Sequence, residues 1–426
     1  MLIPHLSCIF EPILNLFRST KTTTSTMSSC NSNNNNNNNN NKICIVGASP
    51  SGLALGALLE KQGGCDYVIY ESSAEDVPPR GGCLDLHPGS GQRALKDAGV
   101  FEEFKKYARY GDATIHRLFS QKGENFFDFG EGRDAPEIDR WALRKVLLSG
   151  IPKEKTHWKK PVASTTRDEN KQIVLNFANG TTASGFGLVV GADGTWSKVR
   201  HLVTDAKPQY SGNLFVTTKI LPGGPYYEKM KELCRMGSMI VMGKGVHMFN
   251  SRQGDGHYRV DVGIPGPENF ADAGLVDIKD WDAFKKYLLG DDLFGPYSDE
   301  MKEIINQSQG PFRPWIMYYF PTDSLNWKTV PGVTLIGDAA HVTTPFVGDG
   351  VNCAMRDAII LAGKLKELGV SEEAVAAYER EMFPFAIDVI TRSLQSQKMF
   401  FEKKAPKTFI EVMSSGKPLI GTTDHI

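Results

Sequence analysis

Neither sign of charge dominates this sequence. Lysine and arginine together number 48 against 49 aspartates and glutamates, so the formal net charge is -1 at pH 7. Proteins that bind nucleic acid through its phosphates usually carry a marked basic excess. The even balance therefore argues against a nucleic-acid partner.

Paired cysteines are also missing. The seven cysteines are scattered without any Cys-x-x-Cys spacing, which is the spacing of many zinc sites and redox motifs. An odd and dispersed set of cysteines favours reduced thiols inside the cell. We therefore expect no metal site and a cytoplasmic location.

No apolar run is long enough to cross a membrane. Residues 1–17 are apolar but are interrupted by prolines and charged residues, and residues 19–41 form a polar tract that ends in asparagines. A membrane-spanning helix needs about 20 apolar residues. We expect a disordered leader over 1–41 and no transmembrane segment. The hydroxyl-rich stretch near Arg18 and Lys21 leaves an organelle-targeting signal as an alternative.

The sequence does contain three turns rich in glycine and acid, each after a short apolar run. The first follows residues 43–46, a predicted buried strand, and runs through Gly47, Ser49 and Gly52 into an apolar helix. A dinucleotide pyrophosphate needs such a turn, because glycines permit the bend, the approach to phosphate and the packing of helix on strand. Ser49 stands at the second glycine position, so we expect its side chain to crowd the phosphates.

A second predicted strand, residues 67–70, ends at Glu71, which lies roughly twenty residues beyond the first turn. An acid at that place accepts hydrogen bonds from a ribose. This spacing makes the motif more specific than a lone glycine-rich turn, which other α/β domains also contain.

The second turn covers residues 191–200. Asp193 at its tip can accept hydrogen bonds from nearby amides or from a ribityl hydroxyl. Ser197 is placed to cap the segment that follows. A turn of this kind is by itself usually only a turn.

The third turn covers residues 337–352 and leads into an apolar helix. Asp338 follows directly on a predicted strand, where a carboxylate suits a sugar-alcohol hydroxyl. Gly348 and Gly350 allow main-chain amides to come close to a flat polar ring. Three such turns in this order indicate a protein that binds FAD, and hence an oxidoreductase.

The chain resembles the FAD-dependent aromatic hydroxylases, that is, the para-hydroxybenzoate hydroxylase-like monooxygenases. Among these it looks most like the tetracycline-degrading monooxygenases. The likeness covers roughly residues 42–400 and rests on the three turns and on the linking segments 81–87, 90–92 and 136–140. Those linking segments are more specific than any single glycine-rich turn.

The resemblance implies roles for individual residues. It assigns Glu71 to the adenosine ribose and Arg80 to the nicotinamide cofactor. The residues that it assigns to the flavin and the rest of FAD are Asp85, Arg140, Asp338, Gly348, Asp349, Gly350, Val351 and Asn352. An arginine that cannot lose its charge suits phosphate or the electron-rich oxygens of a flavin.

The activity that the resemblance implies is an FAD-dependent monooxygenation, for example in secondary metabolism. NADPH or NADH reduces FAD, and dioxygen then supplies one oxygen atom to a small aromatic or polyketide-like substrate. This chemistry needs no side-chain nucleophile, so we assign no catalytic residue. His341, His257 and Tyr258 are candidate general bases, although a structural or surface role is the more common one for such residues. A flavoprotein oxidase or dehydrogenase, and a non-catalytic FAD-binding protein, are the alternatives.

Two residues depart from the family pattern. Asp349 stands where the family usually has glutamine, so we expect a negative charge that opposes flavin reduction unless the side chain faces solvent. Thr217 stands where relatives have a glutamine in the substrate pocket. The resemblance therefore implies the cofactor and leaves the substrate open.

The order of the motifs predicts an α/β fold with a discontinuous, Rossmann-like FAD-binding domain. We place its two parts at residues 42–207 and 326–368. Short β-rich runs predict an inserted β-sheet substrate domain over 208–325. A C-terminal helix and tail occupy 369–426.

Overall fold

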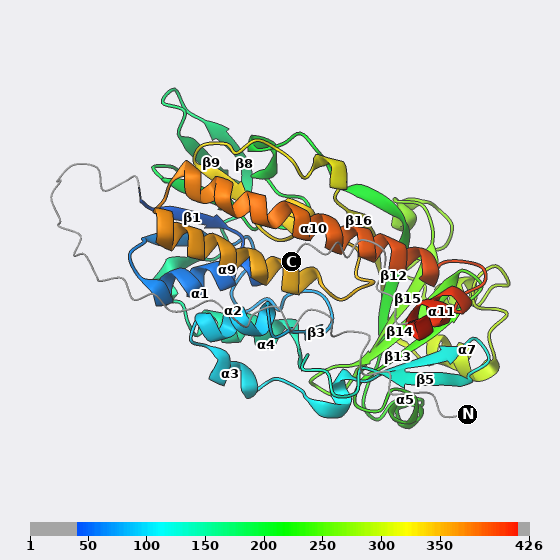
Figure 1. Cartoon of the computed structure of the whole chain (residues 1–426). Coiled ribbons are helices and arrows are strands. Elements are labelled where there is room, and N and C mark those ends of the chain that lie inside the picture. Colours follow the sequence, from blue (N-terminus) through cyan, green and yellow to red (C-terminus); the bar gives the residue numbers. More distant parts are fainter. Residues whose placement is uncertain (1–40, 416–426) are drawn as a thin grey trace.

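The computed structural model describes residues 41–415. The leader expected over 1–41 therefore lies, except for its last residue, outside the described residues. The chain forms two lobes, and the long helix α10 (Glu372–Phe400) runs from one to the other (Figure 1). None of the helices in the described part is both long and apolar enough to span a bilayer.

The first lobe contains a five-stranded sheet in which every neighbouring pair is parallel. The strand order is β17 (Val333–Leu335), β11 (Leu188–Gly191), β1 (Ile43–Val46), β2 (Tyr67–Tyr70) and β7 (Thr156–His157). Nearly all of the residues in the first four strands are buried, as in parallel sheets that are covered on both faces. The strands that precede the three turns are thus adjacent, and the turns meet at one edge of the sheet.

Helices cover this sheet and carry much of the site (Figure 1). They are α1 (Pro50–Gln62), α2 (Gly91–Asp97), α3 (Phe101–Lys105), α4 (Arg140–Leu148), α8 (Asp338–His341) and α9 (Gly350–Leu368). Helices α1 and α9 start directly after the first and third turns. Their N-termini therefore point free amides toward the edge where the turns meet.

The second lobe is built on a seven-stranded sheet. Its order is β16 (Gln309–Tyr319), β12 (Gln209–Ile220), β15 (Tyr258–Pro265), β14 (Val246–Arg252), β13 (Ser238–Gly243), β4 (His116–Ser120) and β5 (Asn125–Phe129). Strands β4 and β5 come from the chain before residue 208, so this sheet draws on both sides of the boundary that the motif order suggests.

The two faces of the large sheet have different partners. One face packs on α5 (Tyr227–Cys234), α6 (Trp281–Leu288) and α7 (Asp299–Asn306). The end of α10 and helix α11 (Lys407–Ser415) pack on the other face, over β4 and β13. Shorter pairings complete the fold: β8 (Val162–Arg167), β9 (Ile173–Phe177) and β10 (Thr182–Ala183) form a small sheet, and β3 (Leu84–Asp85) pairs with β6 (Glu137–Ile138). The predicted α/β class, discontinuous FAD-binding domain and C-terminal helix are confirmed.

Glu379 ties α10 to the first lobe. Its side chain is almost fully buried, and its carboxylate accepts hydrogen bonds from Trp327 Nε1 at 3.1 Å, Thr329 Oγ1 at 2.7 Å and Thr334 Oγ1 at 3.0 Å. Burial raises the pKa of Glu379 despite these hydrogen bonds. The carboxylate is therefore a buried junction between the helix and the sheet.

We expect Glu379→Ala to lower the free energy of unfolding by about 2–4 kcal/mol, because it leaves two buried donors and one half-buried donor without their acceptor. Denaturant unfolding of the purified protein measures this change. Glu381→Ala is the matched control, since Glu381 pairs with Lys364 on the half-exposed side of the same helix and should cost less than ~1 kcal/mol. Equal losses in the two variants would contradict the role of Glu379.

Candidate active site

The first turn has the geometry that a bound pyrophosphate requires. Gly47 has a φ of +109°, and a Cβ there would lie 2.4 Å from the carbonyl oxygen of Ala192. A Cβ on Gly52 would lie 2.1 Å from the carbonyl oxygen of Gly47. Only glycine fits at either position, so the backbone of the turn packs closely against β11 and against its own helix.

Ser49 caps the helix that follows this turn. Its hydroxyl accepts a hydrogen bond from the Gly52 amide at 3.2 Å and lies 3.1 Å from the Ser51 hydroxyl. The serine therefore uses one first-turn amide that would otherwise be free for a phosphate. The serine removes a hydrogen-bond donor from the phosphate site, whereas the sequence suggests that its side chain crowds the phosphates.

Glu71 stands at the end of β2, beside the first turn. Its carboxylate accepts hydrogen bonds from the amides of Ala48 at 2.7 Å and Ser73 at 2.8 Å. Burial alone would raise the pKa of Glu71, but these amide hydrogen bonds lower it below its ordinary value. An ionised acceptor is thus held where the ribose of a dinucleotide is expected.

Arg200 joins the second and third turns. It is buried, and its guanidinium donates to the carbonyl oxygens of Thr195 at 2.8 Å, Asp338 at 3.0 Å and Ala339 at 2.7 Å. The sequence reasoning did not single out Arg200, although it closes the second motif. The one feature of the sequence that could have indicated this role is a permanently charged residue after a strand and a turn.

The second turn is braced from within. Asp193 accepts a hydrogen bond from the Lys198 amide at 2.6 Å, and Ser197 accepts from the amides of Val199 and Arg200 at 3.1 Å each. The sequence predicts that Ser197 caps a helix, but the short 3-10 helix that follows, Arg200–Leu202, has Val199 at its N-cap position, so the hydroxyl of Ser197 holds the turn before that helix. The second carboxylate oxygen of Asp193, Oδ1, is buried and has no hydrogen-bond partner among the described residues.

Asp338 and Arg140 approach the same space from different segments. The Asp338 side chain is accessible, whereas Gly337 and Ala339 on either side of it are buried. Surrounding protein raises the pKa of Asp338, and the charges of His341 and Arg140 oppose that rise. Arg140 Nε is buried without a partner in the described chain, and a Cβ on Gly81 would lie only 2.4 Å from it.

These observations fit a polar cofactor. Buried polar atoms in proteins nearly always have a partner, and here Arg140 Nε and Asp193 Oδ1 lie unpaired beside the three turns. The glycines of the first turn leave room for a ligand to contact the main chain there. The residues present thus match the needs of FAD, with phosphate at the α1 terminus and polyol or ring atoms at the second and third turns.

Asn352 holds a linking segment against the third turn. Its Oδ1 accepts hydrogen bonds from the His87 amide at 2.8 Å and the Ser90 hydroxyl at 3.0 Å, and its Nδ2 donates to the Asp85 carbonyl oxygen at 3.0 Å. The side chain is buried. Asn352 therefore fixes the segment 84–91 on the first turn of α9, and Val351 beside it packs against the core of this lobe.

Asp349 is neither exposed nor uncompensated. Its carboxylate lies 3.3 Å from His87 Nδ1 and 3.0 Å from Arg392 Nη1. Burial alone would raise the pKa of Asp349, but these two partners lower it. From the sequence we expect Asp349 either to oppose flavin reduction or to face solvent. The structure shows a third arrangement, in which two cationic side chains pair with the carboxylate.

The three general-base candidates are engaged elsewhere. His341 Nε2 lies 2.6 Å from Asp357 Oδ2, which also accepts from the Gly337 amide at 2.8 Å. The Tyr258 hydroxyl donates to the Arg235 carbonyl oxygen, and His257 pairs with Asp255 next to it. These contacts give each of the three residues a partner within the protein and lend no support to a role as general base.

Asp357, His341 and Cys353 are the one group in the described chain whose ligand atoms lie close enough to hold a metal ion. The 2.6 Å distance between His341 and Asp357 is that of a direct hydrogen bond. Two ligands of one ion lie about 3 Å or more apart, because each stands about 2 Å from the metal. The group therefore braces the Gly337 turn as a hydrogen-bonded pair.

The face of the large sheet that meets the third turn is aromatic. Phe215 of β12 and Phe249 of β14 are half-buried there, as is Phe346, which precedes Gly348. The rings of Phe215 and Phe346 are 5.8 Å apart. Behind them His247 is fully buried among phenylalanine rings, and this burial lowers its pKa to about 3. The predicted substrate side thus presents apolar rings next to the Gly348–Gly350 loop.

Thr217 lies at the polar end of the same face. Its hydroxyl donates to Asp261 and accepts from Arg259 Nη2 at 2.9 Å. Arg259 and Asp261 are themselves paired at 2.7 Å. The threonine that replaces the family's glutamine is therefore part of a closed polar triad.

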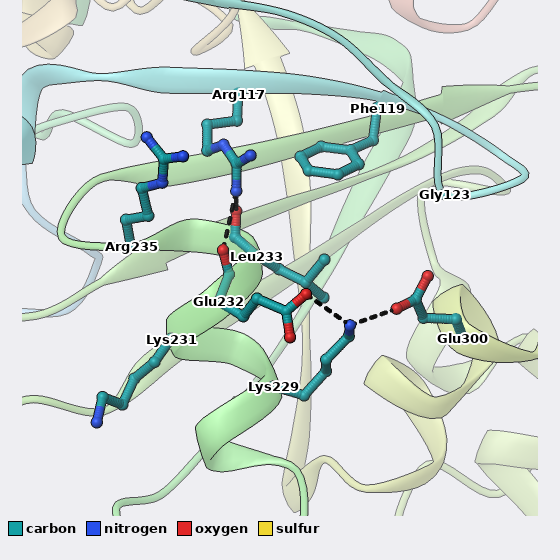
Figure 2. Close-up of a pocket in the computed structure, with 9 residues that line it drawn as sticks. All are labelled: Arg117, Phe119, Gly123, Lys229, Lys231, Glu232, Leu233, Arg235 and Glu300. Atoms are coloured by element: carbon teal, nitrogen blue, oxygen red, sulfur yellow. Dashed lines mark hydrogen bonds and ion pairs between the residues drawn. The ribbon is translucent and has the colours of Figure 1, made fainter.

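A separate hollow of about 570 Å³ lies on the opposite face of this sheet (Figure 2). Arg117 and Phe119 line it, whereas Leu118 between them packs on the α10 side. Side chains alternate along a strand, so the hollow faces away from the three turns. Lys229 pairs there with two glutamates, and its charge is thereby matched within the protein.

Comparison with known proteins agrees with this site. The model of the family described as "FAD binding domain" matches residues 40–215 and 327–393. "Monooxygenase penA" of Penicillium thymicola is 29% identical over 381 residues, which cover 79% of this chain and 88% of the relative. HpxO of Klebsiella pneumoniae, solved with FAD and uric acid, superposes with a TM-score of 0.71 at 20% identity, over 88% of this chain and 92% of that one. The tetracycline destructase Tet(55) gives a TM-score of 0.67 at 19% identity, over 89% of this chain and 97% of that chain.

The fold and the site define an FAD-dependent monooxygenase. The chain belongs to the FAD binding domain family, in the group of para-hydroxybenzoate hydroxylase-like enzymes. The expected family, cofactor FAD and class of activity are confirmed. The roles of individual site residues stay predictions.

We expect Asp338→Ala to weaken FAD binding at least tenfold, about 1.4 kcal/mol, because it removes the carboxylate that enters the shared space. The ratio of flavin to protein absorbance after purification and dialysis measures this loss. Asp323→Ala is the control, since Asp323 is exposed on the surface. An Asp338→Ala protein with full, tightly bound FAD would show that the third turn lies away from the cofactor.

Proposed function

We propose that this enzyme uses NADPH or NADH and dioxygen to insert one oxygen atom into a small aromatic or polyketide-like molecule. The observation that carries this proposal is the pair of half-buried rings Phe215 and Phe346, which lie 5.8 Å apart just before the Gly348–Gly350 loop, with Phe249 packed against the same cluster as Phe346. Flat apolar molecules pack well on such rings. Bound FAD supplies the redox chemistry, taking electrons from the nicotinamide and passing them to dioxygen.

The protein's part is positioning and exclusion of water. The first turn and Glu71 hold the dinucleotide end, and Asp338 and Arg140 hold the polar parts nearer the substrate. The phenylalanine rings exclude water from the face where oxygen is transferred, which protects reactive species from side reactions. His247 is held neutral by its burial and contributes shape to this face.

A relative solved with uric acid and one named a monooxygenase support the reaction class. The relatives do not identify the substrate of this chain, because the substrate is selected by the particular residues that form this chain's aromatic face. We also propose a cytoplasmic location, which the five unpaired cysteines of the described chain support.

The reaction is tested by aerobic NADPH oxidation with the FAD-loaded protein and a panel of phenols, quinones and polyketide aromatics. We expect at least one compound to accelerate NADPH oxidation about tenfold or more, to suppress peroxide release and to gain one oxygen atom by mass. Peroxide formed in proportion to substrate oxidised would instead indicate an oxidase. A flavin that NADPH never reduces would indicate a non-catalytic FAD-binding protein.

Arg80 is the proposed contact for the nicotinamide cofactor. Its side chain is exposed, and it forms no ion pair within residues 41–415. We expect Arg80→Ala to raise the NADPH concentration for half-maximal flavin reduction about tenfold, the equivalent of one lost charged contact, and to leave FAD content unchanged. Arg93→Ala is the control, because Arg93 is exposed and pairs only with Asp97. Unchanged NADPH dependence would remove Arg80 from the cofactor site.

A further inference from the structure

We propose that Asp349, His87 and Arg392 are the centre of a charge-balanced chain of six side chains, and that this chain sets the reduction potential of FAD at the Gly348–Gly350 loop. This proposal rests on the proposed placement of the flavin beside that loop. It assigns the three residues a positioning and electrostatic role, with no part in bond making or breaking.

The chain links three separate segments. His87 follows β3, and its two ring nitrogens lie 3.2 Å from Asp85 Oδ2 and 3.3 Å from Asp349 Oδ1. Arg392 of α10 lies 3.0 Å from the other oxygen of Asp349 and 2.7 Å from Asp388, one turn earlier in the same helix. The flavin loop is thereby tied to α10 and to the linking segment by ion pairs.

The members are matched in charge. Asp85, Asp349 and Asp388 supply three negative charges, and His87, Arg133 and Arg392 supply three positive ones when His87 is protonated. Arg133 lies 3.0 Å from Asp85 Oδ2. The six side chains are only 17% to 28% exposed, so water screens their charges less than it screens those on the surface.

His87 is protonated at neutral pH. Burial alone would lower its pKa, but hydrogen bonds to Asp349 and Asp85 raise it to about 9. For Asp85, burial would raise the pKa, and the contact with His87 lowers it to about 2. Within the chain, Arg133 Nη2 also lies 3.4 Å from His87 Nε2, and the described group outside the chain that acts on Asp85 is the more distant His116. The chain is therefore neutral in sum in the working enzyme.

This balance matters because reduction adds charge. A hydride donor gives FAD two electrons and one proton, so the ring system becomes one unit more negative. An unmatched charge beside the loop changes the cost of that step, since charges interact strongly in poorly screened surroundings. Asp85 is close to the loop as well, because a Cβ on Gly348 would lie 3.6 Å from its Oδ1. Asp349 alone would oppose reduction, and its two cationic partners cancel that effect.

Two substitutions of opposite sign test the proposal. Arg392→Gln leaves the chain with excess negative charge and should make FAD harder to reduce. Asp349→Asn leaves excess positive charge and should make FAD easier to reduce. The double variant should return close to the wild-type potential. Each single shift should be at least tenfold in the ratio of reduced to oxidised FAD at fixed potential, which is about 30 mV for a two-electron couple.

The measurement is an anaerobic redox titration of each FAD-loaded protein near neutral pH, followed by flavin absorbance with a reference dye. Lys364→Gln is the matched control. It removes one positive charge from another ion pair between α9 and α10, roughly 21 Å along α9 from Gly350, and should leave the potential unchanged. Arg392→Lys keeps the charge and should stay within a few-fold of the wild-type ratio.

The outcomes separate this proposal from the proposed function. Shifts of the same sign in both single variants, or shifts no larger than that of Lys364→Gln, would overturn the charge-balance proposal while FAD chemistry stands. A wild-type protein that binds no FAD would overturn the proposed function instead. If Arg392→Gln does not fold, Asp388→Asn tests the same chain and should raise the potential by a smaller step than Asp349→Asn. A lowered or unchanged potential in that variant would also overturn the proposal.

Discussion

The parallel pairing of β17, β11 and β1 is the constraint on which the site depends. Parallel strands place all their carboxyl ends at one edge of a sheet, so the turn after each strand arrives at the same place. Segments that are almost three hundred residues apart in the chain thereby share one binding space. Arg200 then locks two of these turns together through main-chain carbonyls, which fixes their spacing independently of any bound ligand.

The turns approach neighbouring backbone closely. Glycines remove the steric clash of that approach, and buried hydrogen bonds support the turns. Gly47 and Gly52 let the first turn lie against β11 and α1, while Asp357 and His341 support the third turn from below. Ser49 also satisfies a main-chain group, since its hydroxyl accepts a hydrogen bond from an amide that the helix leaves unpaired. Many polar groups of the turns are satisfied within the protein, whereas Asp193 Oδ1 and Arg140 Nε are buried without a partner in the described chain.

The aromatic face and the charge chain meet at one loop. Phe346 belongs to the large sheet's apolar face, and Asp349, three residues later, belongs to the ion-pair chain that reaches α10. A single short loop thus joins the aromatic face to the ion-pair chain. Helix α10 supports both, through Phe400 at its end and Arg392 in its body.

Local pattern determined much of this protein. Periodicity and spacing predict the short apolar strands, the glycines of the first turn, Glu71 beyond that turn, and Asp338 after the last strand. They do so because strands, turns and helix starts depend on neighbouring residues. The resemblance added the linking segments and the family. The discontinuous domain also followed from motif order alone.

Only the tertiary structure decided what surrounds these residues. The sequence showed Asp349 as an unusual charge, but its partners His87 and Arg392 lie far from it in the chain, and no spacing rule connects them. The same holds for Arg200, two of whose three acceptors are carbonyls of a distant turn, and for β4 and β5, which join a sheet formed mostly by later strands. Charge compensation and sheet membership depend on contacts between remote segments, and such contacts exist only once the chain has packed.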